Sequence, residues 1–204
     1  MKRLIFKIFV VIIIIVFILA FSESYSALNL DNLAFVVAMG IDTSNTDKIK
    51  VTFEFINVPS NSQGDTSKSE IILNTVEASS ISNAVSLMNS YLEKRINLSH
   101  CKIIVFSEEY AKNGIKDEVY SLLNDIQVRP TSNIIISKCS AKYYIQKSKP
   151  ILENLVTKYY DVFTSASRFA GYIGDATIGN FSNSCYSKTC DPYAILGGIN
   201  RKYL

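Results

Sequence analysis

Apolar and polar residues alternate with two different periods along this chain, which predicts a domain of strands and helices. Residues 33–41 (LAFVVAMGI) are almost continuously apolar, as in a strand covered on both faces. Residues 48–58 (KIKVTFEFINV) alternate, which predicts a second strand, and Pro59 ends it because proline has no N–H for a ladder. A polar loop, residues 60–69, leads to a third strand at residues 70–78.

After Ser79 and Ser80, either of which can cap a helix, the period changes to that of an amphipathic helix over residues 81–98. The apolar positions are Ile81, Ala84, Val85, Met88, Leu92 and Ile96, up to Leu98. Further elements follow in order: a strand at 101–106, a helical turn at 108–112 closed by a left-handed cap at Asn113-Gly114, a helix at 115–126, a strand at 133–137 and a helix at 151–163.

The N-terminus holds the strongest physical signal in the chain. Residues 8–21 (IFVVIIIIVFILAF) contain no polar side chain, and such a segment enters a membrane as a helix. Its basic flank, residues 1–7, stays in the cytoplasm by the positive-inside rule, so the rest of the protein lies outside the cytoplasm. The run fits either an uncleaved anchor or a signal peptide, for which Ser22, Ser24 and Ser26 suit cleavage. We favour the anchor.

The expected fold class is α+β: a mixed sheet with amphipathic helices packed on it, preceded by an N-terminal membrane helix or signal segment. We expect the segment at residues 1–28, an α+β domain at residues 29–149 and a partial second domain at residues 150–204. The last boundary rests on a shift near Pro150, after which the chain becomes rich in Gly, Ser and Tyr.

Composition and charge exclude two classes of protein. A hydrophobic fraction of 48% provides enough apolar surface for a packed core, so disorder is not expected. The net charge of +3 equals the charge of the three residues that precede the apolar run, Lys2, Arg3 and Lys7. No basic stripe remains for nucleic acid, which we exclude as a partner.

The only histidine, His100, precedes Cys101, and this pair is the one candidate for thiol chemistry. A catalytic dyad needs the imidazole within hydrogen-bond reach of the thiol. Adjacent residues at the start of a strand point to opposite faces, so the pair is badly placed to react. We therefore expect a structural or interface histidine and a buried strand cysteine.

The remaining reactive residues have ordinary structural explanations. Cys185 and Cys190 could close a short disulfide loop, but with Cys101 and Cys139 three pairings are possible. The spacing of the four cysteines does not fit a zinc site. Glu108-Glu109 suits a helix N-terminus better than an acid pair. The three glycines of residues 171–179 (GYIGDATIG) do not match a phosphate loop and predict strand and turn.

Several segments in order resemble the Ger(x)C family, the C subunits of spore germinant receptors. They are LNLDNLAFVVAMGID, KVTFEFINVP, SISNAVSLMNSYLEKRINLSHCKIIVFSEEYAKNGI and DIQVRPTSNIIISKCSA, which resemble the family's N-terminal domain, and YYDVFTSASRFAGYIGDATIGNF and DPYAILGGIN, which resemble the start of its next domain. His100 lies in the family's "LSH" segment, for which no catalytic role is implied.

The resemblance implies a non-catalytic subunit without cofactor, metal or catalytic residues. It would be anchored on the outer face of the spore inner membrane and act with two integral membrane subunits, A and B, in responding to nutrients. A second hypothesis, independent of the family, is an exported small-molecule-binding module that acts alone. A third, an exported thiol enzyme, is disfavoured by the geometry of His100 and Cys101.

Two departures from the family pattern matter. Family members carry a lipobox cysteine before the first strand, whereas here Ser24 or a neighbour stands there. A hydroxyl cannot replace the thiol that accepts the lipid, so we expect no lipidation and an anchor made by residues 8–21. The chain also stops inside what would be the family's second domain, so we expect either a split or truncated gene or a shortened, non-functional paralogue.

Overall fold

The structure, a computed structural model, describes residues 2–21, 32–46, 48–57, 70–148, 156–169, 171 and 173–199. It contains two units, Met1–Asn32 and Leu33–Leu204. Each is described by itself.

The first unit contains helix α1, Lys2–Phe21. Its described apolar side chains are exposed to solvent: Ile5, Phe6, Ile8, Phe9, Val10, Val11, Ile12, Ile13, Ile14 and Phe17. Among the residues that the structure describes, no helix combines the length and the apolar character needed to cross a membrane. The membrane helix expected here therefore stays a prediction.

The second unit is built on a mixed sheet, which confirms the predicted α+β class. Strands β1 (Leu33–Thr43), β2 (Ile49–Asn57) and β3 (Glu70–Ala78) form an antiparallel meander. Strands β4 (Arg95–Asn97) and β5 (Ile103–Ser107) run parallel to β1, β6 (Asn133–Ser137) runs parallel to β5, and β7 (Ile195–Gly197) runs parallel to β6. The order over the described residues is β3-β2-β1-β5-β6-β7, and β4 lies beside the start of β1.

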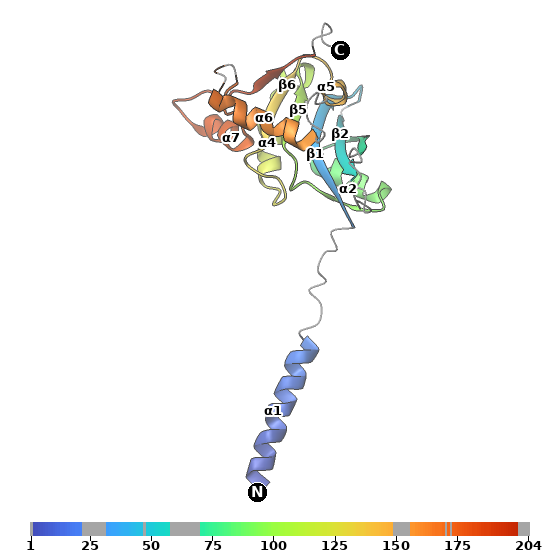
Figure 1. The fold of residues 1–204 in the computed structure, drawn as a ribbon. Coiled ribbons are helices and arrows are strands. Elements are labelled where there is room, and N and C mark those ends of the chain that lie inside the picture. The colour runs from blue at the N-terminus through green and yellow to red at the C-terminus, as the bar shows by residue number, and fades with distance from the viewer. Residues whose placement is uncertain are drawn as a thin grey trace, which may run out of the picture. The chain divides into compact units, whose positions relative to one another are not determined.

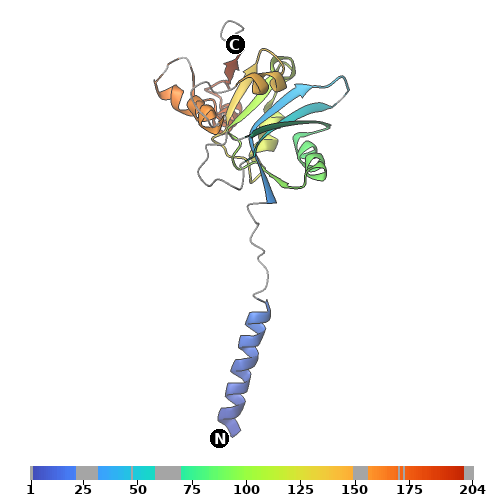
Figure 2. The same cartoon turned by 45° about the vertical axis from the view of Figure 1, so that its right-hand side comes forward.

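Helices cover both faces of this sheet (Figures 1 and 2). One face is covered by α2 (Ile81–Tyr91), α3 (Glu108–Ala111), α4 (Lys116–Leu123) and α7 (Ile178–Tyr186), and the other by α5 (Ala141–Lys147) and α6 (Val156–Phe169). The central strand β1 therefore supplies both cores: Met39 and Ile41 pack on the first face, Val37 and Ala38 on the second. This explains why its sequence is a continuous apolar run.

Several predicted local features are present. Ser80 caps α2 by accepting a hydrogen bond from the Asn83 amide at 3.2 Å. Gly114 has φ of 95° and closes the turn after α3, as the predicted left-handed cap requires. Its amide donates to the Ala111 carbonyl at 3.0 Å.

Other predicted elements were wrong in extent. The helix expected over residues 81–98 ends at Tyr91, and Ile96 lies in β4, where it pairs with Ala34. The helix expected to reach residue 126 ends at Leu123, and the Ile126 side chain is exposed instead of packed. Both errors arise because a few apolar residues at helical spacing also fit a turn, which leads into the short strand β4 in the first case.

The segment after residue 150 also differs from expectation. Within residues 171–179, where strand and turn were predicted, α7 begins at Ile178 and Thr177 caps it. Residues 151–155 of the helix predicted over 151–163 lie outside the described residues, and the rest belongs to α6. In this part of the chain β7 pairs with β6 and Tyr160 lies in the core, and the domain boundary at residue 150 stays a prediction.

Candidate functional site

The strand predicted at residues 101–106 begins only at Ile103, so Cys101 lies in the loop before β5 and is not a strand residue. His100 and Cys101 nevertheless face different surroundings, as predicted. The His100 side chain is exposed, and its ring meets the Phe35 ring edge-on with the centroids 4.8 Å apart. The Ser99 hydroxyl lies 3.0 Å from His100 Nδ1. The Cys101 side chain is only 1% exposed and its thiol donates to the Ile103 carbonyl at 3.4 Å.

The electrostatic surroundings of the pair disfavour thiolate chemistry. Burial raises the pKa of the Cys101 thiol to about 12, and the nearby Glu54 carboxylate acts in the same direction. The pKa of His100 is lowered, first by partial burial and then by the charges of Arg129 and Lys102. The thiol is therefore protonated at neutral pH, whereas a nucleophilic cysteine needs a lowered pKa.

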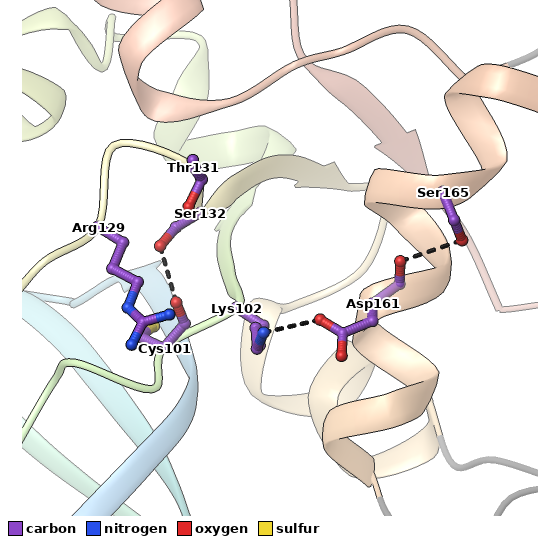
Figure 3. A pocket seen from close by; sticks show the side chains of 7 residues that line it. All are labelled: Cys101, Lys102, Arg129, Thr131, Ser132, Asp161 and Ser165. Atoms are coloured by element: carbon purple, nitrogen blue, oxygen red, sulfur yellow. Dashed lines mark hydrogen bonds and ion pairs between the residues drawn. The ribbon is translucent and has the colours of Figure 1, made fainter.

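A pocket of about 280 Å³ opens beside this loop (Figure 3). It is lined by Cys101, Lys102, Arg129, Thr131, Ser132, Asp161 and Ser165. Lys102 immediately precedes β5 and Ser132 immediately precedes β6. Because these strands are parallel neighbours, their amino ends lie side by side at the same end of the sheet. Helix α6, which covers one face of the sheet, adds Asp161.

Most polar groups in the pocket are already paired with each other. Lys102 Nζ lies 2.8 Å from Asp161 Oδ1, an ion pair that joins the start of β5 to α6 (Figure 3). The Ser132 hydroxyl donates to the Cys101 carbonyl at 2.7 Å, and the Ser165 hydroxyl donates to the Asp161 carbonyl at 3.2 Å. The guanidinium of Arg129 is the second cation of the pocket. The pocket thus contains two cations, Lys102 and Arg129, and one carboxylate, Asp161. The excess positive charge suits weak binding of a small anion.

The other residues singled out in the sequence lie away from this pocket. Glu108 and Glu109 occupy the first turn of α3, and Glu108 pairs with Lys112 at 3.1 Å, in agreement with a helix N-terminus. Cys139, Cys185 and Cys190, like Cys101, are free thiols in the structure. Among the described residues no three His, Cys, Asp or Glu side chains gather as metal ligands.

Sequence reasoning missed a buried polar pair between β2 and α6, the helix that also supplies Asp161 to the pocket. The Tyr160 hydroxyl donates to Glu54 Oε2 at 2.7 Å, and both side chains are almost fully buried. Burial raises the pKa of Tyr160 above its usual range, and the charge of Glu54 adds to the effect. The alternation of β2 placed Glu54 on the polar face, but only the tertiary structure shows that α6 covers that face.

Sequence reasoning also missed helix α5 and the interaction that fixes its first turn. The Asp42 carboxylate accepts hydrogen bonds from the amides of Ala141, at 2.7 Å to Oδ1, and Lys142, at 3.0 Å to Oδ2. Asp42 thus serves as a cap from another element, although Ser140 is the local N-cap. The available signal was an aspartate that directly follows the apolar run of residues 33–41.

Comparison with protein families gives one match. The model of the family described as "Spore germination protein N-terminal domain" matches residues 26–197. Comparisons with curated proteins and with solved structures give no significant match. The matched range extends well past residue 150 and includes α6, α7 and β7.

Proposed function

Since this chain belongs to the family of spore germination protein N-terminal domains, we propose that it acts in germination as a non-catalytic, membrane-anchored subunit of a germinant receptor. The match over residues 26–197 is the observation that carries the proposal. It agrees with the ordered motifs in the sequence, which resemble receptor C subunits.

The N-terminal segment is the proposed anchor. Residues 4–21 contain one charged side chain, Lys7, and residues 8–21 contain none. With Leu4–Phe6 included, the apolar run approaches the roughly 20 residues that a membrane span needs. Its exposed apolar side chains cost free energy in water and would be accommodated in lipid. The basic flank then directs residues 22–204 to the outer face of the spore inner membrane.

The surroundings of the one candidate nucleophile support a non-catalytic role. The Cys101 thiol is buried, and burial raises its pKa to about 12. At neutral pH it is therefore protonated, whereas the thiolate is the form that attacks. His100 is exposed, and its ring contacts Phe35 and the Ser99 hydroxyl. A protein of this kind acts by contact with its neighbours.

The tether would favour the proposed assembly with two integral membrane subunits, A and B. A domain held beside the membrane meets partners in that membrane at a high local concentration, so modest interfaces suffice. We therefore expect the complex to form in the membrane and to weaken when residues 1–21 are removed.

Affinity purification from the spore inner membrane tests this proposal. A C-terminally tagged full chain should co-purify with two polytopic subunits, and the matched variant Cys101→Ser should co-purify with them equally and support germination. Recovery of the tagged protein alone from gently solubilised membranes, with the polytopic subunits present in the same extract, would overturn the assembly. Loss of germination in a stably folded Cys101→Ser variant would overturn the non-catalytic role.

The pocket favours a second candidate, an exported module that binds a small anionic nutrient by itself. Arg129 and Lys102 provide the positive charge that such a ligand needs. This candidate predicts saturable binding of a nutrient carboxylate by the purified protein, with loss of binding in Arg129→Ala and no loss in Lys138→Ala, a substitution outside the pocket. Absence of binding by a folded protein would exclude it.

A further inference from the structure

One end of the second unit presents an unusual combination of exposed side chains. It is the end at which the chain enters β1, because Leu33 pairs with Arg95 at the start of β4. We call the exposed residues there, Tyr91, Lys94, Arg95, Ile126 and Arg129, the amino-end surface.

Contacts with β4 place the two apolar members at this end. Tyr91 is the last residue of α2, and nearby Asn89 Oδ1 accepts from the Ile96 amide in β4 at 2.8 Å. Ile126 precedes Gln127, whose Oε1 accepts from the Leu98 amide at 3.1 Å, directly after β4. Both positions therefore lie close to β4, the short strand that pairs with the first residues of β1.

These two side chains are the most exposed large hydrophobic residues among those described. Ile126 is 99% exposed and Tyr91 is 73% exposed. Single exposed apolar residues are common, but a fully exposed isoleucine contributes nothing to the core and remains in contact with water. Tyrosine with its polar hydroxyl suits a membrane interface, and isoleucine suits insertion between lipids.

The turn that carries Ile126 is held in place. Asp125 Oδ1 accepts from the Gln127 amide at 2.9 Å, and the Val128 amide donates to the Asp125 carbonyl at 3.0 Å. Val128 is buried on the other side of the turn. The isoleucine is thus presented outward on a fixed support and does not need a conformational change to contact a surface.

The surrounding charges are compatible with an anionic membrane. Lys94, Arg95 and Arg129 are exposed cations, opposed by Glu93 and Asp125. Lys102 and Asp161 form an ion pair without net charge, so they do not change this sum. Among the described residues at this end the excess is one positive charge, which favours lipid headgroups of negative charge.

The covalent connection limits how far this surface can be from the anchor. Residues 22–32 join Phe21 to Leu33, and a fully extended chain of this length reaches about 40 Å. We propose that the amino-end surface docks on the bilayer that holds α1, with Ile126 in the lipid interface and the cations at the headgroups. This inference rests on the proposed anchoring by the N-terminal segment.

The absence of tryptophan from the sequence allows a direct test. The full-length variant Ile126→Trp is reconstituted into vesicles of phosphatidylcholine and phosphatidylglycerol, with or without brominated acyl chains. Docking predicts blue-shifted emission and at least twofold quenching by the brominated lipid. The matched control is Tyr143→Trp on α5, which begins beside Asp42 near the far end of β1, about 30 Å away, and should show neither effect.

Charge variants of the Ile126→Trp protein complete the test. Arg95→Glu combined with Arg129→Glu should reduce the quenching of the introduced tryptophan, whereas Lys138→Glu combined with Lys142→Glu, after β6 and in α5, should leave it unchanged. Unshifted and unquenched emission from an Ile126→Trp protein that co-floats with the vesicles would overturn the docking and leave the anchoring intact. Failure to co-float would instead refute the anchoring, and with it this inference. A blue shift seen only after the polytopic subunits are added would identify a protein partner and also overturn it.

Discussion

The hydroxyl of Tyr160 on α6 donates a 2.7 Å hydrogen bond to the carboxylate of Glu54 on β2, in the core of the second unit. The two residues are 106 positions apart in the sequence, so this bond fixes the late helix to the early strand. A buried carboxylate costs free energy unless it is hydrogen-bonded, and removing one of its donors has a measurable effect.

Replacing Tyr160 by phenylalanine should lower the free energy of unfolding by about 1–3 kcal/mol, because the buried carboxylate loses a hydrogen bond while the ring remains packed. Urea denaturation of the purified protein measures the change. The matched control, Tyr159→Phe, removes a half-buried hydroxyl that accepts a longer bond of 3.3 Å from Ser148 and should cost less. Equal effects of the two substitutions would contradict the role of the buried pair.

The stability should decrease at alkaline pH, in part because of Cys101. Its thiol ionises near pH 9 when unfolded and near pH 12 when folded, because burial raises its pKa. The unfolded state therefore binds fewer protons in this window, and the stability that is complete below pH 9 is lost as the pH rises toward 12. In Cys101→Ala the slope of unfolding free energy against pH, between pH 9 and 10, should be smaller by up to about 1.4 kcal/mol per pH unit. Identical slopes would argue against burial of the thiol.

Tyr144 also lowers the stability above pH 10, because burial raises its pKa to about 12. This contribution is the same in both proteins.

The four thiols should differ in their reaction with a water-soluble disulfide reagent. Cys190 is exposed and should react first, and Cys139 and Cys185 are partly exposed and should follow. Cys101 should react only after unfolding, because its thiol is buried and protonated. Mass spectrometry of the labelled peptides measures the order. Early labelling of Cys101 in the folded protein would contradict the packing of the loop before β5.

Replacing Asp42 by alanine should destabilise α5, because the amides of Ala141 and Lys142 both lose their acceptor. The expected loss is about 1–3 kcal/mol in the free energy of unfolding, with faster hydrogen exchange in residues 141–147. Ser140→Ala, which removes the local cap accepting from the Tyr143 amide, should cost about 1 kcal/mol or less at this exposed position. A larger effect of Ser140→Ala would assign the main capping role to the serine.

Gly114→Ala should lower stability by about 1 kcal/mol, because φ of 95° disfavours a residue with a Cβ atom although the space around it is open. Gly198→Ala, at a glycine that also has open space but no positive φ, should be nearly neutral. Thermal unfolding of the two variants compares them directly. Equal stabilities would mean that the turn after α3 does not need the left-handed conformation.

Much of the sheet could be predicted because its strands carry local signals. The continuous apolar run of β1, the alternation of β2 and the "NIIIS" segment of β6 each indicate a strand without reference to the rest of the chain. Burial of Cys101 followed from the same pattern, and the structure confirms it.

Other features could not be read from local patterns. Helix α5 is short, with the sequence AKYYIQK, and depends on Asp42, which lies 99 residues earlier. Likewise, β4 is three residues long and exists because the start of β1 lies beside it. Neither segment has enough residues for a period to identify it.

The sequence alone determined the apolar N-terminal segment, the alternation of strands and amphipathic helices, and the family to which the chain belongs, because each is encoded in the order of neighbouring residues. Only the tertiary structure decided that α6 covers Glu54, that Lys102, Arg129 and Asp161 share a pocket, and that Tyr91 and Ile126 lie at one end of the sheet. These relationships depend on which distant segments pack together. That is set by the combined burial of two cores, to which no single stretch of sequence contributes more than a part.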